Sequence, residues 1–542
     1  MKTVGRFVLA VVFGAILTGP MPRAARAVED VEATIAAARR AAHENRNADA
    51  ARLFQQAAAA APELRISLLP ELADQLTYSG QASKAIPLYR EALASRALAS
   101  DAERHAVLGL ALALSWNNQL SQSLATYDAL LVRNPRDINA LLGYARVLSW
   151  QDRLTASLHE YERVLAFDPR NQEALDGIAR VQSWRGRQRD AQRRARKILA
   201  NNAADAQAAI TLANSELWMG RPDQAGRDGW ALLSTHRDDS EVRNLTADLA
   251  EASEARAQMT GSTAASSDKL TIHSSTVETE TRFAQGSTSL GARYQPIVYV
   301  GQPSVGSASE ARLGFFARSR LNDCSEINGT VSNDEVTATG TESKNLLLYD
   351  TWLTLWPDDT LRFDVGSRRE TFDNVLSLQL GVTAVFETLS MDVTPDENDH
   401  FSVRANQGAY SDGNRRGWEQ AEFERVVLRQ PRLSFGARTT GFSFSQSLND
   451  GYFAPPRYRS AQLTTHLWGN VQGRLWYDVS GAYGREWVLD GGTRPTHAVS
   501  ASLAYFVSRP VSVSAFYNSF DTRESQSGFA RTTLGLGLQT KW

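Results

Sequence analysis

Charged and aromatic side chains recur at alternating positions in the second half of the chain. Asp364 lies two residues after Arg362, and Trp356 lies four after Trp352, so each pair shares one phase of an alternating strand. Flat rings can stack on sugar faces, and charged groups can hydrogen-bond sugar hydroxyls. The set therefore favours binding of a hydrated sugar polymer; the alternative is that these residues only solvate and brace a wall. Its members are Trp352, Trp356, Arg362, Asp364, Arg368, Arg404, Tyr410, Arg438, Trp476, Asp478 and Glu486.

The sequence shows no motif of a catalytic or metal centre. Its 8 histidines are scattered, without H-E-x-x-H spacing, and no G-x-S-x-G turn is present. The single cysteine, Cys324, excludes a disulfide within the chain, a cysteine zinc site and an iron–sulfur cluster. We expect no enzyme activity and no cofactor, although an enzyme that assembles its site from distant residues stays open as an alternative. A net charge of −2 gives no reason to expect a nucleic-acid partner.

Tryptophans recur every 34 residues in the first half, at Trp116, Trp150, Trp184 and Trp218. This period predicts a solenoid of helix pairs and resembles the tetratricopeptide repeat. We expect each ring at the end of the first helix of its repeat. One interpretation is packing between repeats, and the other is a row of rings that binds sugar or a partner.

Small residues, an aromatic residue and a proline mark the two helices of each repeat. Ala145 lies in a first helix, Ser157 and Tyr161 lie where the second helix packs, and Pro169 ends that helix. We predict six repeats and an amphipathic capping helix. The repeats cover residues 31–64, 66–99, 104–137, 138–171, 172–205 and 206–239, and the capping helix covers 240–257.

The composition predicts two architectures behind an address signal. Residues 1–27 combine a basic start, a short apolar run and an A-x-A site, as a secretory signal peptide does. Residues 28–269 hold 12 aromatic residues and residues 270–542 hold 33. We therefore predict an all-α solenoid over 28–257, a small polar linker over 258–269 and a β domain over 270–542.

The β domain alternates at period two. Leu534, Leu536 and Leu538 share one phase, and Gly535 and Gly537 share the other. Long strands and a terminal aromatic, Trp542, favour an antiparallel transmembrane β-barrel over a sandwich. We count 15 strand-like segments. Because the chain must enter and leave the barrel on the same side of the membrane, the number of strands must be even, so it is 14 or 16.

Short and longer links alternate between these strands, which predicts the orientation. Links such as 357–359 and 508–510 are short, whereas 370–377, 445–457 and 489–496 are longer. Because outer-membrane barrels have short periplasmic turns, the repeats and the C-terminus are predicted on the periplasmic side, with Cys324 in one of these turns. Loops 370–377 and 445–457 are candidates to fold inward as constrictions.

The order of signal peptide, repeats and barrel resembles the outer-membrane exopolysaccharide export porins, which include the export porin of bacterial cellulose synthase and the poly-N-acetylglucosamine export porin. Two features carry the resemblance. One is the Ser-Trp at helix ends, and the other is a loop similar to the Gly-Tyr-Phe-Ser-Pro loop of the cellulose porin. The loop residues are Gly451, Tyr452, Phe453, Ala454, Pro455, Pro456, Arg457 and Tyr458, with Ala454 in place of the serine. Six repeats are far fewer than in the cellulose porin, which favours a shorter member of the class.

The resemblance implies a polysaccharide as cargo. It also implies that the repeats dock an inner-membrane synthase, periplasmic modifying proteins or the polymer, while outer-membrane lipid surrounds the barrel. The rival expectation is a scaffold or surface receptor with a closed barrel. The sequence does not identify the polymer.

Overall fold

A computed structural model describes residues 23–235, 239–303, 306–489, 491–523 and 530–542. The predicted signal peptide therefore lies for the most part outside the described residues. The chain forms two compact units, one ending at Val181 and one beginning at Gln182. Within the described residues, none of the helices has both the length and the apolar character needed to cross a membrane.

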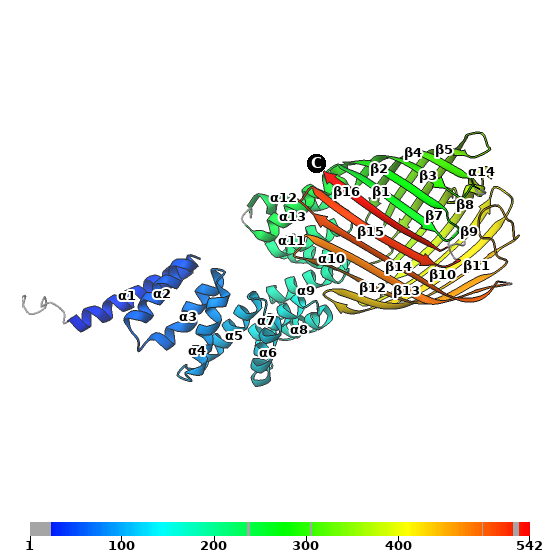
Figure 1. Cartoon of the computed structure of the whole chain (residues 1–542). Helices are drawn as coiled ribbons and strands as arrows, with labels where there is room; N and C mark the ends of the chain where they lie inside the picture. The colour runs from blue at the N-terminus through cyan, green and yellow to red at the C-terminus, as the bar shows by residue number, and fades with distance from the viewer. Residues whose placement is uncertain (1–22, 236–238, 304–305, 490, 524–529) are drawn as a thin grey trace, which may run out of the picture. The chain divides into compact units, whose positions relative to one another are not determined.

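The first unit is a series of antiparallel helix pairs, as the 34-residue period predicts (Figure 1). Its helices are α1 (Arg23–His43), α2 (Asn47–Ala60), α3 (Arg65–Tyr78), α4 (Ala82–Ala94), α5 (Ser100–Trp116), α6 (Leu120–Arg133), α7 (Ile138–Trp150), α8 (Leu154–Phe167) and most of α9 (Gln172–Trp184). The Ser157 hydroxyl donates to the Ala145 carbonyl at 2.7 Å and so joins the two helices of one pair. The Tyr127 ring packs against Gly143 of the next helix pair. A Cβ added at Gly143 would lie 2.3 Å from that ring.

The second unit begins with further helices and continues into a closed barrel. The helices are α10 (Gln188–Asn201), α11 (Ala206–Trp218), α12 (Pro222–Thr235) and α13 (Ser240–Ser253). Leu245 of α13 is buried against Ala213 and Ala225, so this helix covers the apolar face of the α11–α12 pair. The chain then enters the barrel at Arg256.

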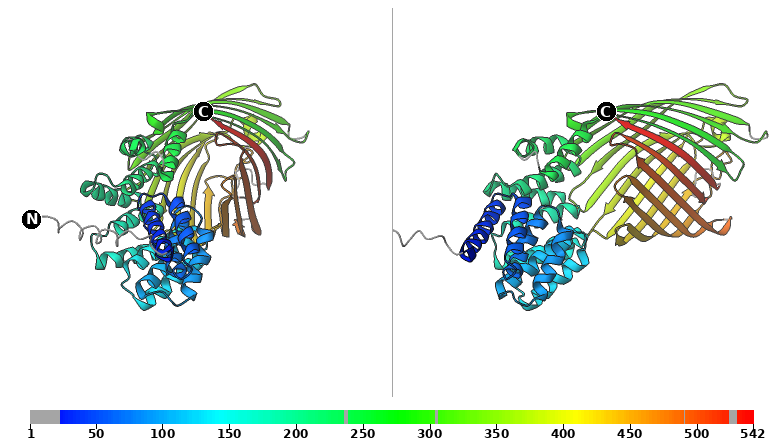
Figure 2. Two further views of the ribbon diagram at one scale, coloured as in Figure 1. Left: turned by 90° about the vertical axis from the view of Figure 1, so that its left-hand side faces the viewer. Right: turned by 60° about the vertical axis from the view of Figure 1, so that its left-hand side comes forward.

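Sixteen antiparallel strands form the barrel, and β1 pairs with β16 to close it (Figures 1 and 2). The closure confirms the predicted fold class and selects 16 strands over 14. The strands are β1 (Arg256–Ser266), β2 (Thr271–Phe283), β3 (Thr288–Val300), β4 (Ser307–Asn322), β5 (Ser325–Ala338), β6 (Lys344–Leu355), β7 (Leu361–Glu370), β8 (Ala384–Val393), β9 (Asp399–Tyr410), β10 (Arg415–Arg429), β11 (Arg432–Phe444), β12 (Tyr458–Val471), β13 (Leu475–Val488), β14 (Gly492–Phe506), β15 (Val511–Asp521) and β16 (Arg531–Lys541). A 3-10 turn, η1 (Ala284–Gly286), and a short helix, α14 (Val375–Leu380), lie in the connections.

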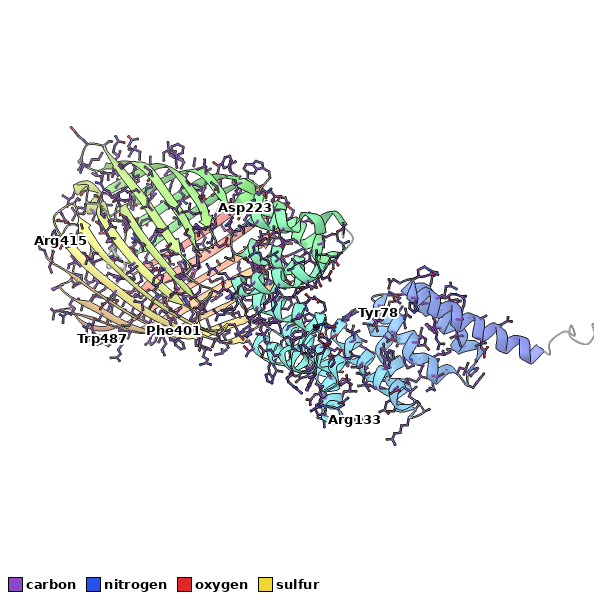
Figure 3. All side chains as sticks on the ribbon, turned by 180° about the vertical axis from the view of Figure 1, so that it is seen from behind. Tyr78, Arg133, Asp223, Phe401, Arg415 and Trp487 are labelled. Atoms are coloured by element: carbon purple, nitrogen blue, oxygen red, sulfur yellow. The ribbon has the colours of Figure 1, made fainter. Side chains whose placement is uncertain are left out.

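The two faces of the barrel wall differ in the way that a bilayer requires. Leu353, Val365 and Leu389 are cross-strand neighbours and are all exposed on the outer face. Phe401 and Trp487 also lie on the outside of the strands (Figure 3). The opposite face is polar, as in the buried carboxylate of Asp364 between Thr354 and Ser390. An apolar exterior around a polar lumen is the pattern of transmembrane barrels.

Two boundaries differ from the sequence prediction. Residues 258–269, predicted as a linker, form most of β1 and the turn after it. Most side chains of this segment are small and polar, so no alternation of large apolar residues marks it as a strand in the sequence. Only its pairing with β16 identifies it as a strand. The predicted long link 489–496 is also shorter, because β14 already begins at Gly492.

Candidate functional site: the lumen of the barrel

The inward face carries ten of the eleven predicted side chains, and cross-strand pairing aligns several of them. Asp364 pairs with Ser390, Ser390 with Arg404, and Arg404 with Gln420. The same belt continues around the wall to Glu486. Trp356 is the exception, because β6 ends at Leu355 and the ring therefore lies in the β6–β7 turn.

Three of the predicted residues hold the structure together rather than face open lumen. The fully buried Glu486 carboxylate accepts hydrogen bonds from Arg494, at 2.5 Å, and from Tyr458, at 3.0 Å. Asp364 accepts from Thr354 at 2.6 Å and from Ser390 at 3.1 Å. The third, Tyr410, is buried among other rings. Removing such carboxylates would leave buried donors unpaired, which is costly, so their role is to brace the wall.

Other predicted residues leave rings and charges open to the lumen. Trp352 lies on Gly366, which has no side chain, and its indole nitrogen donates to Asp350. Trp476 is 41% exposed on β13, two residues before Asp478, whose carboxylate lies 3.1 Å from His466. The remaining members of this group are Arg362, which pairs with Asp364, Arg368, which pairs with Glu370, Arg404, which is exposed, and Arg438, which donates to Gln462.

A segment after β7, residues 371–383, crosses the lumen at the end of the barrel opposite the short turns; we call it the strap. Its Asp373 carboxylate lies 2.8 Å from an Arg531 nitrogen on β16 and accepts from the Tyr299 hydroxyl of β3 at 3.2 Å. Strands β7 and β16 are seven steps apart in the barrel, on opposite walls. Val375 and Leu378 of α14 are buried against Tyr299, which anchors the strap further. The predicted inward fold of this loop is therefore present.

The glycine-tyrosine loop predicted from the resemblance closes against the strap. The Ser377 hydroxyl donates to the Asp450 carbonyl at 2.7 Å. Gly451 has φ +87°, and a Cβ there would lie 2.5 Å from the Ser377 hydroxyl oxygen, so only glycine fits. Tyr452 stacks on Tyr410, with ring centroids 4.7 Å apart.

These rings belong to one buried cluster inside the same end of the barrel as the strap, which we call the strap-end cluster. Phe453 packs on its edge, and Pro455 and Pro456 lead from the loop into β12. The strap-end cluster consists of Phe372, Phe386, Tyr410, Phe442, Phe444, Tyr452 and Tyr458, with Val382, Ala384, Ala454 and Val488.

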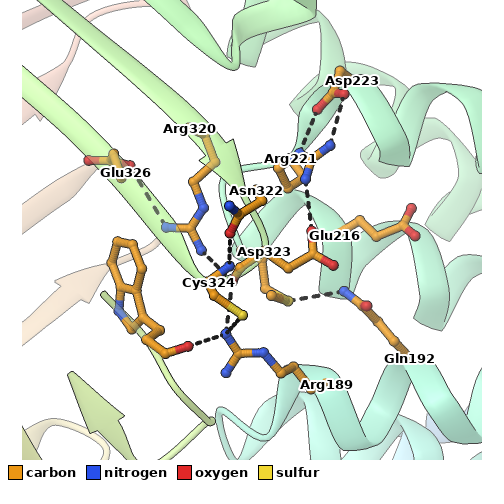
Figure 4. Close-up of polar contacts among 12 residues, drawn as sticks. Arg189, Gln192, Glu216, Arg221, Asp223, Arg320, Asn322, Asp323, Cys324 and Glu326 are labelled. Atoms are coloured by element: carbon orange, nitrogen blue, oxygen red, sulfur yellow. Dashed lines mark hydrogen bonds and ion pairs between the residues drawn. The ribbon is translucent and has the colours of Figure 1, made fainter. Parts of the chain in front are cut away.

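The short-turn end of the barrel holds the helices of the second unit through charged contacts (Figure 4). Arg185 lies 3.0 Å from the Glu397 carboxylate in the β8–β9 turn. Arg189 donates to the carbonyls of Asp323, at 2.8 Å, and Trp356, at 2.6 Å. Arg221 lies 2.8 Å from the Asp323 carboxylate. Guanidinium groups suit this role because each can hold several acceptors at once.

Two carboxylates among these helices, the buried Glu216 and the half-buried Asp223, have opposite pKa shifts. Burial and the neighbouring Asp228 raise the pKa of Glu216 to about 8, although Arg196 lies 2.8 Å away. Burial alone would raise the pKa of Asp223, but hydrogen bonds from Arg221 and Arg227 outweigh it and lower that pKa. Arg221 therefore joins two carboxylates, Asp223 within the helices and Asp323 on the barrel.

The repeat tryptophans have different surroundings. Trp150 packs against the core of the first unit, whereas Trp116, Trp184 and Trp218 keep 46%, 39% and 53% of their surface exposed. Tyr78 contacts Trp116 edge to face, with ring centroids 5.9 Å apart. Packing between repeats thus accounts for Trp150, and the other three leave ring surface open to solvent.

Sequence reasoning predicted that loop 370–377 folds inward, but it missed the individual residues that hold the strap in place. Arg531 follows the inward phase of β16, but its partner Asp373 lies in a loop, where no alternation marks the direction of a side chain. Phe372 was equally invisible, because a loop aromatic gives no indication that it stacks on a tyrosine from β9.

Comparisons with known proteins give only distant similarities. No protein-family model matches the sequence, and a search of curated proteins finds no match. A bacterial polysaccharide outer-membrane secretin is 12% identical with a TM-score of 0.43, covering 54% of this chain and 99% of its own. OccK5 of Pseudomonas aeruginosa is 11% identical with a TM-score of 0.31, covering 53% of this chain and 98% of its own.

The helical part has similar distant neighbours. A tetratricopeptide repeat protein of Parabacteroides merdae is 17% identical with a TM-score of 0.34, covering 40% of this chain and 84% of its own. All three TM-scores lie below 0.5, so the architecture rests on the helix packing and strand pairing of this chain itself.

Proposed function

We propose that this protein is an outer-membrane export channel for a secreted polysaccharide, with its repeats in the periplasm. The observation that carries the proposal is the lumen wall of a closed 16-strand barrel. There, partly exposed rings such as Trp352 and Trp476 share the inward face with charged groups such as Arg404. A barrel of this size encloses space for a hydrated chain, and rings beside hydrogen-bonding groups suit sugar faces and hydroxyls.

The placement of the helices supports the orientation. Helices α10, α12 and α13 contact the end of the barrel that has the short turns. The C-terminal residue lies at that end as well, because the Trp542 amide donates to the Ala255 carbonyl. Short turns face the periplasm in outer-membrane barrels. The repeats would then meet an inner-membrane synthase, periplasmic modifying proteins or the emerging polymer.

Transport in this proposal is passive. Synthesis at the inner membrane pushes the polymer, and the barrel conducts it through a wet lumen without a catalytic residue or a cofactor. The wall would lower the free-energy cost of moving a polyhydroxylated chain through the lumen. Its paired charges can form hydrogen bonds with the sugar hydroxyls that replace those made by water.

The strap favours a second candidate, an outer-membrane scaffold or receptor with a closed barrel. The Asp373–Arg531 contact joins opposite walls across the lumen, and the Asp373–Tyr299 contact holds the strap to β3 as well. In the export proposal the strap opens during transport, whereas in the scaffold it is permanent.

Deletion and electrical recordings separate the two candidates. Deleting the gene should abolish polymer at the cell surface and leave it in the periplasm, and the full chain should restore secretion. Unchanged surface polymer would contradict export. In planar bilayers the export channel should show discrete conductance steps, whereas a permanently closed scaffold should show none.

A further inference from the structure

A cavity of about 470 Å³ lies at the short-turn mouth of the barrel, within the second unit. Trp218 and Met219 border it from the end of α11, and Arg189 borders it from α10. The β6–β7 turn contributes Trp356, and the inward-facing Arg362 and His400 continue the lining into the lumen. The cavity thus joins the last repeat to the channel wall, and we call it the inlet site.

Two indole rings line the inlet site, and they are held differently. Trp218 is 53% exposed, so its ring surface is available to a ligand. Trp356 is fixed in place, because the Arg320 guanidinium lies 3.9 Å from its ring centroid and Arg189 donates to its carbonyl at 2.6 Å. A fixed ring costs little conformational entropy when a ligand stacks on it. Neither ring is needed to close the barrel, since both lie outside its strands.

The charges of the inlet site are paired. Arg189 lies 3.6 Å from Asp359, and His400 lies 3.1 Å from Asp392. Arg362 is paired with Asp364 at 2.9 Å. Four basic side chains and four aspartates line the cavity, so donors and acceptors are abundant but neither sign of charge is in excess. Such a lining suits a polyhydroxylated ligand without net charge, because an ionic ligand would meet groups of its own sign.

We propose that the inlet site binds a neutral sugar chain as it passes from the repeats to the lumen, with Trp218 and Trp356 as stacking platforms. This inference rests on the proposed export function and adds to it the place of capture and the charge class of the polymer. The aspartates and arginines at the rim hydrogen-bond the hydroxyls, and the rings contact the apolar faces of the sugars.

Calorimetric titration of the full chain in detergent with cellohexaose, a neutral hexasaccharide, tests the inlet site without requiring an open pore. Trp218→Ala should raise the dissociation constant about tenfold, since a stacking aromatic is a typical binding hot spot. Trp356→Phe keeps a ring and should weaken binding less. Trp116→Ala is the matched control, because Trp116 ends the first helix of another repeat, is 46% exposed and does not line the cavity.

Each outcome has a distinct meaning. Failure of the unmodified chain to bind cellohexaose, or equal weakening by Trp116→Ala, would overturn the inlet site. Tighter binding of a glucosamine hexamer or a galacturonate hexamer would overturn the neutral class. Secretion of polymer by cells that lack the gene would instead overturn the export function itself. Because Trp218 is largely exposed, its truncation removes little packing, and an unchanged far-UV circular dichroism spectrum verifies the fold of the variant.

Discussion

The strap should open more often when its tether to β16 is removed. Asp373→Ala deletes the carboxylate that lies 2.8 Å from Arg531 and accepts from Tyr299 at 3.2 Å. A hydrogen bond to a charged group contributes about 1.5–3 kcal/mol. Because Asp373 is 56% exposed, solvent screening reduces this to about 1 kcal/mol. We therefore expect the ratio of open to closed channels to rise about fivefold.

Single-channel recording of the full chain in planar bilayers measures this ratio directly. Raising the salt concentration from about 0.1 to about 1 M shortens the screening length from about 10 Å to about 3 Å. The open probability of the unmodified channel should therefore rise with salt, and that of Asp373→Ala should change little. Asp521→Ala is the matched control, since Asp521 pairs with Arg494 at 3.0 Å but does not touch the strap.

Two results would refute the gating argument. An open probability of Asp373→Ala equal to that of the unmodified channel would mean that the remaining contacts of the strap hold it alone. Equal opening by Asp521→Ala would mean that any lost ion pair loosens the barrel, so the strap would have no special role.

Three further predictions concern the repeats and the orientation. Gly143→Ala places a Cβ 2.3 Å from the Tyr127 ring and should lower the free energy of unfolding by about 1–3 kcal/mol, measured by urea unfolding of the helical signal. The control Asn139→Ala, at an exposed position of the same helix, should change it by no more than about 0.5 kcal/mol. Glu216 has a folded-state pKa of about 8, above its unfolded value of about 4.3, so stability of these helices should fall as pH rises between the two values, and Glu216→Gln should flatten this dependence in thermal unfolding at about pH 6 and about pH 9. Cys324 is exposed in a short turn, so a membrane-impermeant maleimide should label it only in cells with a permeabilised outer membrane; labelling of intact cells would reverse the orientation.

The local periodicity of the sequence was sufficient to predict the helices and strands and which of their faces are buried or exposed. The 34-residue spacing places Ser157 over Ala145, and the contact forms as a hydrogen bond between the two helices. Alternation likewise assigns Leu534, Leu536 and Leu538 to the outer face, where all three are exposed. These predictions succeed because the face on which a residue lies, buried against a helix or exposed to lipid, follows from the pattern of the few residues around it.

The strand number and the use of the lumen required the tertiary structure. Strand β1 is recognisable only through its pairing with β16, and Asp373 meets Arg531 across 158 residues of sequence. Tyr410 has the inward phase that the sequence predicts, yet Phe372 from the strap covers it. By itself the sequence determined a helical solenoid followed by a barrel wall with known inner and outer faces. Which inward residues brace the wall, which stay open to a ligand and what crosses the lumen were decided by contacts between distant segments, which leave no periodic trace.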